Sequence, residues 1–266
     1  MRDKQIIIFE GICGSGKTTT AKQLHKYLQE SGVNSRVYEE WEKSHPVNLA
    51  MHACITETEL NSLCEEYPLH SERLKQKAVY EYSYVFIQYR EIYNEIETRY
   101  FDGGLFEKLA EKDFCFGTKN IVPFDEYTNI LKNKWKKFAD DFMTNEVEII
   151  IFESVLFQHQ IHDLHRLYNM DNDGIINHIS ILAEQFKMFN PVIIYLTQAN
   201  LDENLKRIAA ERNKPRFYER INVYKKRKQI EYEAMSRLKL KNYVIDNSDY
   251  DYSKVFKIIK MIIDIK

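Results

Sequence analysis

Five short apolar runs stand along the chain, and each is short enough to form one strand of a buried parallel sheet. The runs cover residues 6–9, 35–38, 148–152, 192–196 and 242–246. Segments with helical periodicity separate them, and the run at 35–38 is the least apolar. This alternation predicts an α/β fold in which helices cover both faces of a five-stranded parallel sheet.

Helical periodicity is clear after several of these strands, where apolar residues recur every three or four positions. The expected helices cover residues 19–30, 175–189, 202–212, 216–240 and 252–263. Gly32 follows the first of them as a stop signal, and Pro215 separates the third from the fourth.

Residues 47–145 differ from the rest of the chain, because helical periodicity dominates there and no run stands out as a strand. The clearest helix is predicted over 71–100, where Tyr82, Phe86 and Tyr89 recur at spacings of three and four. We therefore predict a large all-helical insertion between the second and third strands of the sheet. No repeat or low-complexity linker interrupts the chain, which predicts a single domain over residues 1–266.

The composition excludes several classes of protein. Of the 266 residues, 44% are hydrophobic and 29% are charged, which is typical of a soluble globular protein. The net charge of −2 argues against a general nucleic-acid binder. No apolar run approaches the ~20 residues needed to cross a bilayer, and we expect no signal peptide. A cytoplasmic protein is predicted, and the sequence leaves open whether it forms a homodimer.

Cysteine and histidine positions give no clear metal site. The four cysteines have no C-x-x-C spacing, so neither a zinc site nor a disulfide framework is expected. His159, His162 and His165 share a spacing of three, which would place them on one helical face. No carboxylate or cysteine completes an obvious set of ligands around them.

The turn after the first strand carries a phosphate-binding motif. Gly11-Ile12-Cys13-Gly14-Ser15-Gly16-Lys17-Thr18 fits the P-loop pattern G-x-x-x-x-G-K-[ST] at every fixed position. A strand precedes the loop and a helix follows it, which is the context that the motif requires. Three of the chain's eight glycines lie here, where they let successive backbone N–H groups converge on a phosphate near the positive end of the helix.

We expect ATP as the nucleotide and Mg²⁺ as its metal ion. Lys17 would reach the β- and γ-phosphates, and the Thr18 hydroxyl would ligate Mg²⁺. The nucleotide would lie on the loop and the first turn of the helix. Its expected contacts there are Gly11, Cys13, Gly14, Ser15, Gly16, Lys17, Thr18 and Thr19.

Carboxylates follow two further strands of the predicted sheet, at the edge where ligands bind in parallel sheets. Glu153 ends the third strand, where P-loop enzymes place a carboxylate near Mg²⁺. Glu39 and Glu40 end the second strand, where a kinase needs a carboxylate to accept the proton of the attacking hydroxyl. Alternation along a strand predicts that one of this pair faces the cleft and one faces away, without saying which.

A strongly basic segment, residues 206–228, is expected to act as a lid. Arg212 and Arg216 lie on either side of Pro215, in the segment that follows the fourth strand. Arginines so placed would close on the transferred phosphate and stabilise the charge of the transition state. Residues 225–228 are expected to form only a solvated helix face.

The acceptor site is expected in the insertion, where aromatic residues surround Gln88. On a helix near the cleft, Gln88 would hydrogen-bond a planar ligand stacked on an aromatic ring. Trp41, Tyr84 and Arg220 are further candidate contacts of the acceptor. An aromatic stripe of this kind is also typical of a helix that faces a protein core.

These motifs resemble those of the P-loop nucleoside and nucleotide kinases, the deoxynucleoside kinase and thymidylate kinase group. Phe9-Glu10-Gly11 leading into the loop is similar to the start of both families, and residues 244–248 are similar to the end of thymidylate kinases. Glu153 stands where they carry an acid after the third strand. The resemblance implies the three-layer fold of P-loop NTPases with strand order 2-3-1-4-5, ATP–Mg²⁺ as donor and an arginine-bearing lid.

The chain departs from this group at several positions. Ser154 stands where an arginine is expected after the acid, and Cys13 stands where thymidylate kinases carry aspartate. Glu39-Glu40-Trp41 replaces their Arg-Glu-Pro-Gly stretch. Cys13 together with Gly14-Ser15 favours phosphorylation of a hydroxyl over phosphorylation of a nucleotide.

The predicted function is ATP- and Mg²⁺-dependent phosphate transfer to a small molecule, in the first place a nucleoside or nucleotide. Two alternatives stay open. In the first alternative, the kinase acts on another small molecule, either an aminoglycoside-type antibiotic or a sugar nucleotide. The positive charge of an aminoglycoside would suit Glu39, Glu40 and Glu42. In the second alternative, the protein is an ATP-hydrolysing switch whose insertion binds another protein. No Asn-Lys-x-Asp motif occurs, which argues against GTP.

Overall fold

The computed structural model describes residues 4–42, 45–93, 96–119 and 122–263. It contains two compact units: the first combines Met1–Glu40 with Lys136–Lys266, and the second is Trp41–Trp135. The long helix α5 (Phe124–Thr144) contributes residues to both units. The second unit covers most of the predicted insertion. The organisation of residues 1–266 as a single domain stays a prediction.

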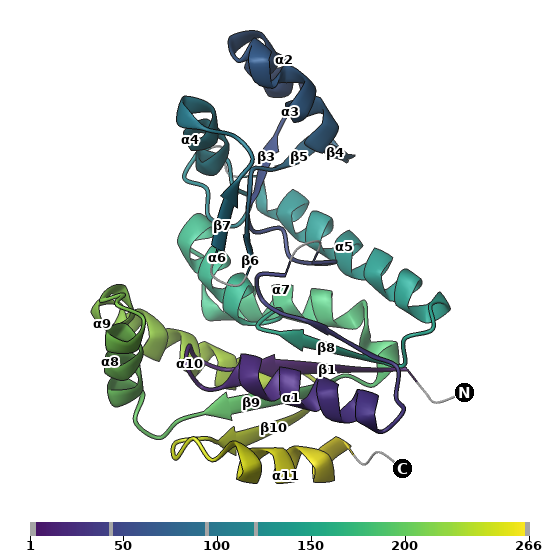
Figure 1. Ribbon diagram of the computed structural model, residues 1–266, viewed down its shortest axis with the longest axis vertical. Coiled ribbons are helices and arrows are strands. Elements are labelled where there is room, and N and C mark those ends of the chain that lie inside the picture. Colours follow the sequence, from purple (N-terminus) through teal and green to yellow (C-terminus); the bar gives the residue numbers. More distant parts are fainter. Residues whose placement is uncertain (1–3, 43–44, 94–95, 120–121, 264–266) are drawn as a thin grey trace. The chain divides into compact units, whose positions relative to one another are not determined.

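The first unit is built on a five-stranded sheet in which all neighbouring strands are parallel (Figure 1). Its strands are β1 (Gln5–Glu10), β2 (Ser35–Tyr38), β8 (Ile149–Glu153), β9 (Val192–Thr197) and β10 (Lys241–Asp246). They stand in the order β2-β8-β1-β9-β10, which reads 2-3-1-4-5 when only these strands are counted. Each strand begins and ends within one residue of the run predicted for it. The α/β fold and its strand order are therefore confirmed.

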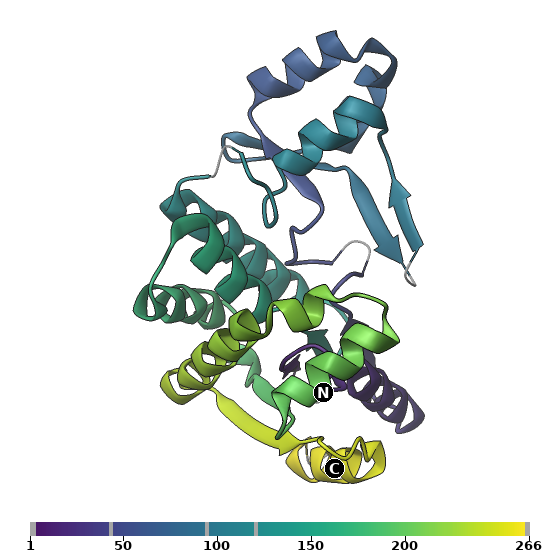
Figure 2. The same ribbon diagram turned by 90° about the vertical axis from the view of Figure 1, so that its left-hand side faces the viewer.

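Helices cover both faces of this sheet, as Figures 1 and 2 show. On one face, α1 (Lys17–Glu30) and α11 (Tyr252–Ile263) pack around a core that includes Ile7 and Ile194. On the other face, the rings of Phe138 in α5 and Phe152 in β8 lie 5.1 Å apart. The three central strands β1, β8 and β9 are buried at nearly every position, so their sequences are continuously apolar rather than alternating, whereas β10 at one edge is mostly exposed.

The first unit also contains α6 (Gln158–Tyr168), α7 (Asn172–Glu184), α8 (Leu201–Glu211), α9 (Arg216–Glu219), α10 (Ile221–Arg237) and a 3₁₀ turn at Lys187–Phe189. The long helix predicted over 216–240 is broken at Arg220, which ends α9 and precedes the first turn of α10. No helix was predicted over α6 as a whole, because its sequence is rich in histidine and glutamine and its apolar face is narrow.

The second unit mixes strands and helices. A three-stranded antiparallel sheet has the order β3-β5-β4, and β6 and β7 form a separate antiparallel pair. The strands are β3 (His52–Ile55), β4 (Ala78–Glu81), β5 (Tyr84–Gln88), β6 (Arg90–Tyr93) and β7 (Ile96–Arg99). The helices are α2 (Glu57–Glu66), α3 (Ser71–Lys77), α4 (Gly103–Glu111) and the first part of α5, with a 3₁₀ turn at Pro68–His70. Its core includes Ile55, Leu74, Val85 and Ile87.

The prediction of an all-helical insertion was wrong. Only Ser71–Lys77 of the helix predicted over 71–100 is helical, and four strands follow it. Tyr82 adopts a left-handed turn conformation with φ 57°, and Val85, Phe86 and Ile87 are buried between two partner strands. Aromatic and β-branched residues favour strands, and here pairing with distant strands decided the conformation that local spacing left ambiguous.

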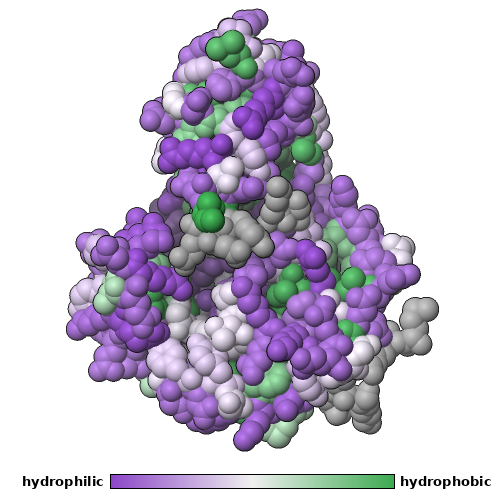
Figure 3. Space-filling model, viewed as in Figure 1, coloured by the Kyte–Doolittle hydropathy of each residue, from purple (hydrophilic) through white to green (hydrophobic). Residues whose placement is uncertain are grey.

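In the part of the chain that the structure describes, no helix combines the length and the apolar character needed to cross a bilayer. Hydrophilic residues dominate the face seen in Figure 3, and apolar residues are scattered over it in small groups.

Candidate active site

The P-loop connects β1 to α1 with glycine at each position where the backbone needs it. Gly11, Gly14 and Gly16 have φ angles of 138°, 75° and 98°, a region that other residues rarely adopt. A Cβ atom at Gly11 would lie 2.2 Å from the Leu196 carbonyl oxygen, and one at Gly14 would lie 2.0 Å from Ile208. The loop is therefore closely enclosed by β9 and α8.

Side chains from two neighbouring connections hold the carbonyl groups of this loop. Each is an amide that donates a hydrogen bond to a loop carbonyl, and all three come from elements far along the chain. The pairs are Asn204 Nδ2 with Cys13 O (2.9 Å), Gln198 Nε2 with Gly14 O (3.2 Å) and Asn247 Nδ2 with Ser15 O (2.8 Å). These bonds fix the backbone of the loop in place.

The N-terminus of α1 is suited to bind an anion. Gly16 caps the helix and supplies no side-chain acceptor for the first backbone N–H groups. The helix dipole adds partial positive charge at the same place. Among the predicted contacts, Cys13 is half-buried, the Ser15 side chain is buried, and Thr19 is exposed on α1.

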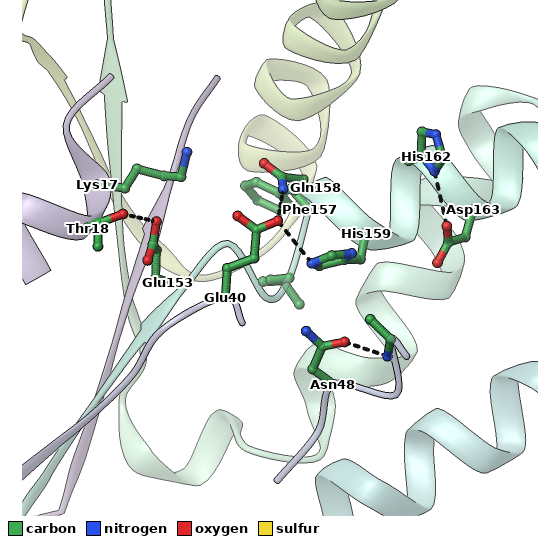
Figure 4. Close-up of polar contacts among 12 residues, drawn as sticks. Lys17, Thr18, Glu40, Asn48, Glu153, Phe157, Gln158, His159, His162 and Asp163 are labelled. Atoms are coloured by element: carbon green, nitrogen blue, oxygen red, sulfur yellow. Dashed lines mark hydrogen bonds and ion pairs between the residues drawn. The ribbon is translucent and has the colours of Figure 1, made fainter. Parts of the chain in front are cut away.

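Lys17 is buried and folds back over the loop. Its Nζ donates to the carbonyl oxygens of Gly11, at 2.8 Å, and Ile12, at 3.3 Å. Its positive charge also acts on two carboxylates, Glu40 and Glu153, whose pKa values it lowers against the effect of burial. The lysine, the loop and both carboxylates thus belong to one site, shown in Figure 4.

Thr18 and Glu153 lie side by side at the carboxyl ends of β1 and β8. The Thr18 hydroxyl donates to Glu153 Oε1 at 2.6 Å, and the burial of Glu153 raises its pKa. A hydroxyl and a carboxylate are oxygen ligands of the kind that Mg²⁺ prefers, and Mg²⁺ usually takes only one or two protein ligands beside phosphates and water. The two residues therefore fit a magnesium–nucleotide site.

The structure separates Glu39 from Glu40. Glu39 forms an ion pair with Lys22 of α1 at 2.9 Å and stays partly exposed. Glu40 is largely buried and accepts a hydrogen bond from Gln158 Nε2 at 2.5 Å. Of the two carboxylates, Glu40 is therefore the one that lies beside Lys17 and Glu153.

Glu40 lies close to a histidine and to three positively charged side chains. His159 Nε2 lies 3.5 Å from Glu40 Oε1, and burial lowers the pKa of His159 to about 4, so the ring is neutral near pH 7. Burial raises the pKa of Glu40, while the charges of Lys17, Arg227 and Arg212 act in the opposite direction. A buried carboxylate with a raised pKa suits the acceptance of a proton.

The three histidines of α6 do not converge. His159 contacts Glu40, His162 Nδ1 lies 3.1 Å from Asp163 Oδ1, and His165 Nε2 lies 2.5 Å from Lys226 Nζ. Among the described residues, no group of three or more His, Cys, Asp or Glu side chains is arranged to hold a metal ion.

The basic segment 206–228 divides into exposed and tethered parts. Arg212, Arg216 and Arg220 are exposed, and the Phe217 ring lies 5.7 Å from each of the Arg212 and Arg216 guanidinium groups. Arg212 is near enough to Glu40 to lower its pKa. Arg220 lies at the junction between α9 and α10.

The expectation that residues 225–228 form a solvated face was wrong for part of the segment. Lys225 pairs with Asp202 at 2.9 Å, and Lys228 Nζ donates to the Gln198 carbonyl at 3.1 Å. Arg227 is buried, with 8% of its surface exposed, because it turns toward the P-loop rather than into solvent.

A second set of polar residues surrounds the base of the P-loop, and motif reasoning did not find it. Arg227 pairs with Glu231 at 3.1 Å, and the Tyr195 hydroxyl donates to Glu231 at 2.6 Å. Glu10 is fully buried and accepts from the backbone N–H groups of Leu156, at 2.7 Å, and Phe157, at 3.0 Å. Burial, reinforced by the nearby charge of Glu231, raises the pKa of Glu10 to about 8.

The remaining acceptor candidates belong to the second unit. Trp41 is partly exposed, and its ring lies 6.1 Å from that of Phe116. Tyr84 and Gln88 are the first and last residues of strand β5, so the helix expected to carry them does not exist. Both side chains are half-buried, and Gln88 pairs with His52 across the sheet.

No family model and no curated protein sequence matches the chain. Solved structures with a similar arrangement include the thymidylate kinases of Candida albicans and Ehrlichia chaffeensis, each at 14% identity, with TM-scores of 0.47 and 0.41. The alignments cover 97% of this chain in both cases, and 92% and 99% of those chains.

A third similar structure is the YorR protein of Bacillus subtilis in complex with phosphorylated GDP. It is 14% identical, with a TM-score of 0.43, and the alignment covers 98% of this chain and 96% of that chain. Similarity of this degree does not assign the chain to a family. The function is therefore argued below from the site itself.

Proposed function

We propose that this protein transfers a phosphate group from ATP to a small-molecule acceptor, in the first place a nucleoside or nucleotide. The observation that carries the proposal is the pairing of Thr18 with Glu153 at 2.6 Å beside the buried Lys17. A P-loop alone indicates only nucleotide binding, whereas the addition of a carboxylate near the threonine hydroxyl is typical of a magnesium–nucleotide site.

The P-loop supplies the donor site. The backbone N–H groups at the start of α1 would hold the phosphates, because Gly16 provides no side-chain cap for them. Lys17 would leave its carbonyl partners and contact the β- and γ-phosphates. Thr18 and Glu153 would hold Mg²⁺, which, when bound, neutralises part of the phosphate charge.

Glu40 is the candidate base. It lies near Lys17 and Glu153, and a hydrogen bond from Gln158 holds its carboxylate. A carboxylate at this place would accept the proton of an attacking hydroxyl as the phosphate bond forms. This role favours a hydroxyl over a phosphate as the acceptor group.

Arg212 and Arg216 are the candidate lid arginines. Both are exposed and border the connection between α8 and α9, a segment with few buried contacts of its own. Positive charge brought to the transferred phosphate would stabilise the transition state. Trp41, Tyr84, Gln88 and Arg220 stay proposed contacts of the acceptor, and residues 47–145 its proposed binding region.

The structure offers little support for a cationic acceptor. Glu39 is paired with Lys22, and Glu40 is buried and held by Gln158, so the two do not present a shared acidic surface. A cytoplasmic location and a homodimer stay proposals that accompany the kinase function.

Binding of a non-hydrolysable ATP analogue with Mg²⁺, measured by thermal shift, tests the donor site. A ligand at 100 times its Kd stabilises the folded protein by about 2.7 kcal/mol. We expect this shift in the wild type and in Lys26→Ala, which alters an exposed lysine of the same helix, and a much smaller shift in Lys17→Ala at the same ligand concentration. Equal shifts in all three proteins would contradict the proposed donor site.

A second screen identifies the acceptor. Nucleosides, nucleotides, aminoglycosides and sugar nucleotides are added with ATP, and formation of ADP is measured for each. The proposal predicts that ADP formation depends on one class of acceptor. A constant rate of hydrolysis whatever is added would instead favour an ATP-hydrolysing switch.

A further inference from the structure

The carbonyl group of Gly11 has two cationic donors. Lys17 Nζ donates to it at 2.8 Å, and Arg227 Nη2 donates to the same oxygen at 3.4 Å. Lys17 reaches the carbonyl from the start of α1, whereas Arg227 reaches it from α10 and lies 216 residues after Gly11 in the chain. The shorter of the two hydrogen bonds is the one from Lys17, and Lys17 is also the residue that a bound phosphate would draw away from the carbonyl.

Arg227 is anchored where it stands. Its Nε lies 3.1 Å from Glu231 Oε1, one helical turn along α10, and Glu231 is fully buried. The Tyr195 hydroxyl of β9 donates to the other oxygen of that carboxylate at 2.6 Å. A buried guanidinium needs a paired charge, and the Glu231 carboxylate supplies it.

A buried carbonyl that loses a charged donor becomes less stable. If the proposed function holds, Lys17 must release the Gly11 and Ile12 carbonyls before it can contact a phosphate. Arg227 is already within bonding range of Gly11, and a small movement would turn its long contact into a full hydrogen bond.

We propose that Arg227 is a positioning residue for nucleotide binding: anchored by Glu231 and Tyr195, it keeps the Gly11 carbonyl satisfied when Lys17 turns to the phosphates. This inference rests on the proposed function. In this role Arg227 contacts the backbone of the P-loop and affects nucleotide binding through Lys17.

The proposed role of Arg227 predicts different effects on the affinities for ATP and for AMP. Without Arg227, the release of Lys17 would leave the Gly11 carbonyl with no charged donor, so ligands that recruit Lys17 would bind more weakly. ATP carries the β- and γ-phosphates that Lys17 contacts, whereas AMP does not. Loss of Arg227 therefore weakens ATP binding and leaves AMP binding almost unchanged.

The experiment measures Kd values for a non-hydrolysable ATP analogue and for AMP by thermal shift, which registers weak binding through its concentration dependence. The variants are Arg227→Gln, Arg227→Lys and the pair Arg227→Gln with Glu231→Gln, which removes both buried charges together. Arg237→Gln alters an exposed arginine of the same helix and serves as the matched control. Circular dichroism confirms that each variant is folded.

We expect Arg227→Gln and the double variant to bind the ATP analogue about tenfold more weakly, as loss of one charge-assisted hydrogen bond implies. Arg227→Lys restores part of the affinity, and Arg237→Gln matches the wild type. In a Lys17→Ala background, Arg227→Gln changes the Kd less than about twofold. Without the lysine, no charged donor leaves the Gly11 carbonyl on binding, so Arg227 has no loss to compensate.

Three results would overturn the inference. Equal weakening of ATP and AMP would show that Arg227 only supports the fold, and additive effects in the Lys17→Ala background would show that it does not act through the lysine. An unchanged Kd in a folded variant would remove the role altogether. Failure of the wild type itself to bind the ATP analogue would refute the proposed function, and the inference with it.

Discussion

The Thr18 hydroxyl donates a 2.6 Å hydrogen bond to Glu153, although 135 residues separate the two in the chain. Parallel pairing of β1 with β8 brings them together, since it places the carboxyl ends of both strands at the same edge of the sheet. This relationship joins the loop that we propose to hold the phosphates to a carboxylate that suits a magnesium ion, and it leads to the first prediction.

Removal of either partner should abolish magnesium-dependent turnover. Glu153→Gln and Thr18→Ala are expected to lower ATP turnover by at least about 100-fold, because each loses an oxygen ligand at the proposed metal position. Thr18→Ser keeps the hydroxyl and should keep most of the activity. Turnover is measured over a range of Mg²⁺ concentrations, with exposed Glu184→Gln as control. Wild-type turnover in both damaging variants would refute the metal position.

Glu40 and Glu39 should behave differently, although they are neighbours in the sequence. Glu40→Gln removes the buried carboxylate beside Lys17, so we expect it to lower acceptor phosphorylation by about 100-fold or more while binding of the ATP analogue persists. Glu39→Gln breaks only a partly exposed ion pair and should change the rate less than about threefold. The comparison of kcat for the two variants decides the assignment, and the reverse ranking would make Glu39 the base.

Arg212 should contribute to the rate of transfer more than to binding. Its charge reaches Glu40 from an exposed position, as expected of a residue at the mouth of the site. We expect Arg212→Ala to lower kcat by at least about tenfold with a smaller change in the KM for ATP. Lys214→Ala, in the same exposed segment, is the control. If both substitutions have the same small effect, Arg212 does not belong to the site.

Glu10 should make stability depend on pH. Burial raises its pKa to about 8 in the folded protein, from an ordinary value of 4.5. Between these values the folded state keeps a proton that the unfolded state has released, so the free energy of unfolding falls as pH rises. Above about pH 8 this contribution stays constant.

Glu10→Gln has no proton to lose, and its amide oxygen can still accept from the Leu156 and Phe157 N–H groups. Denaturant unfolding at pH 5.5, 7 and 8.5 should show the wild type losing stability relative to this variant by up to about 1.4 kcal/mol per pH unit. Glu184→Gln, at an exposed site, should follow the wild type. Parallel curves for the wild type and Glu10→Gln would show that Glu10 is ionised in the folded protein.

The first unit could be predicted in detail because its signals are local. A strand that is buried on both faces must be apolar at nearly every position, so Ile6–Ile7–Ile8 and Ile149–Ile150–Ile151 stand out in the sequence without any partner. The P-loop motif is equally local, since its glycines, Lys17 and Thr18 stand at fixed spacings within eight residues.

The second unit could not be predicted in this way. Its strands are short, and Tyr84 to Gln88 shows no alternation, because three of the five residues are buried on both sides of one small sheet. The same residues fit a helical spacing equally well. Pairing with β3 and β4 decided between the two, and that pairing joins residues as far apart in the chain as His52 and Gln88.

By itself, the sequence determined the α/β architecture, the position of the P-loop motif and the set of acids that end its strands. Only the tertiary structure decided that Glu40 and not Glu39 lies beside Lys17, that Asn204, Gln198 and Asn247 hold the loop, and that Arg227 turns inward to Gly11. The physical reason is that the spacing of apolar residues depends on burial and backbone conformation, both of which are local. A contact between side chains far apart in the chain produces no periodic pattern in the sequence.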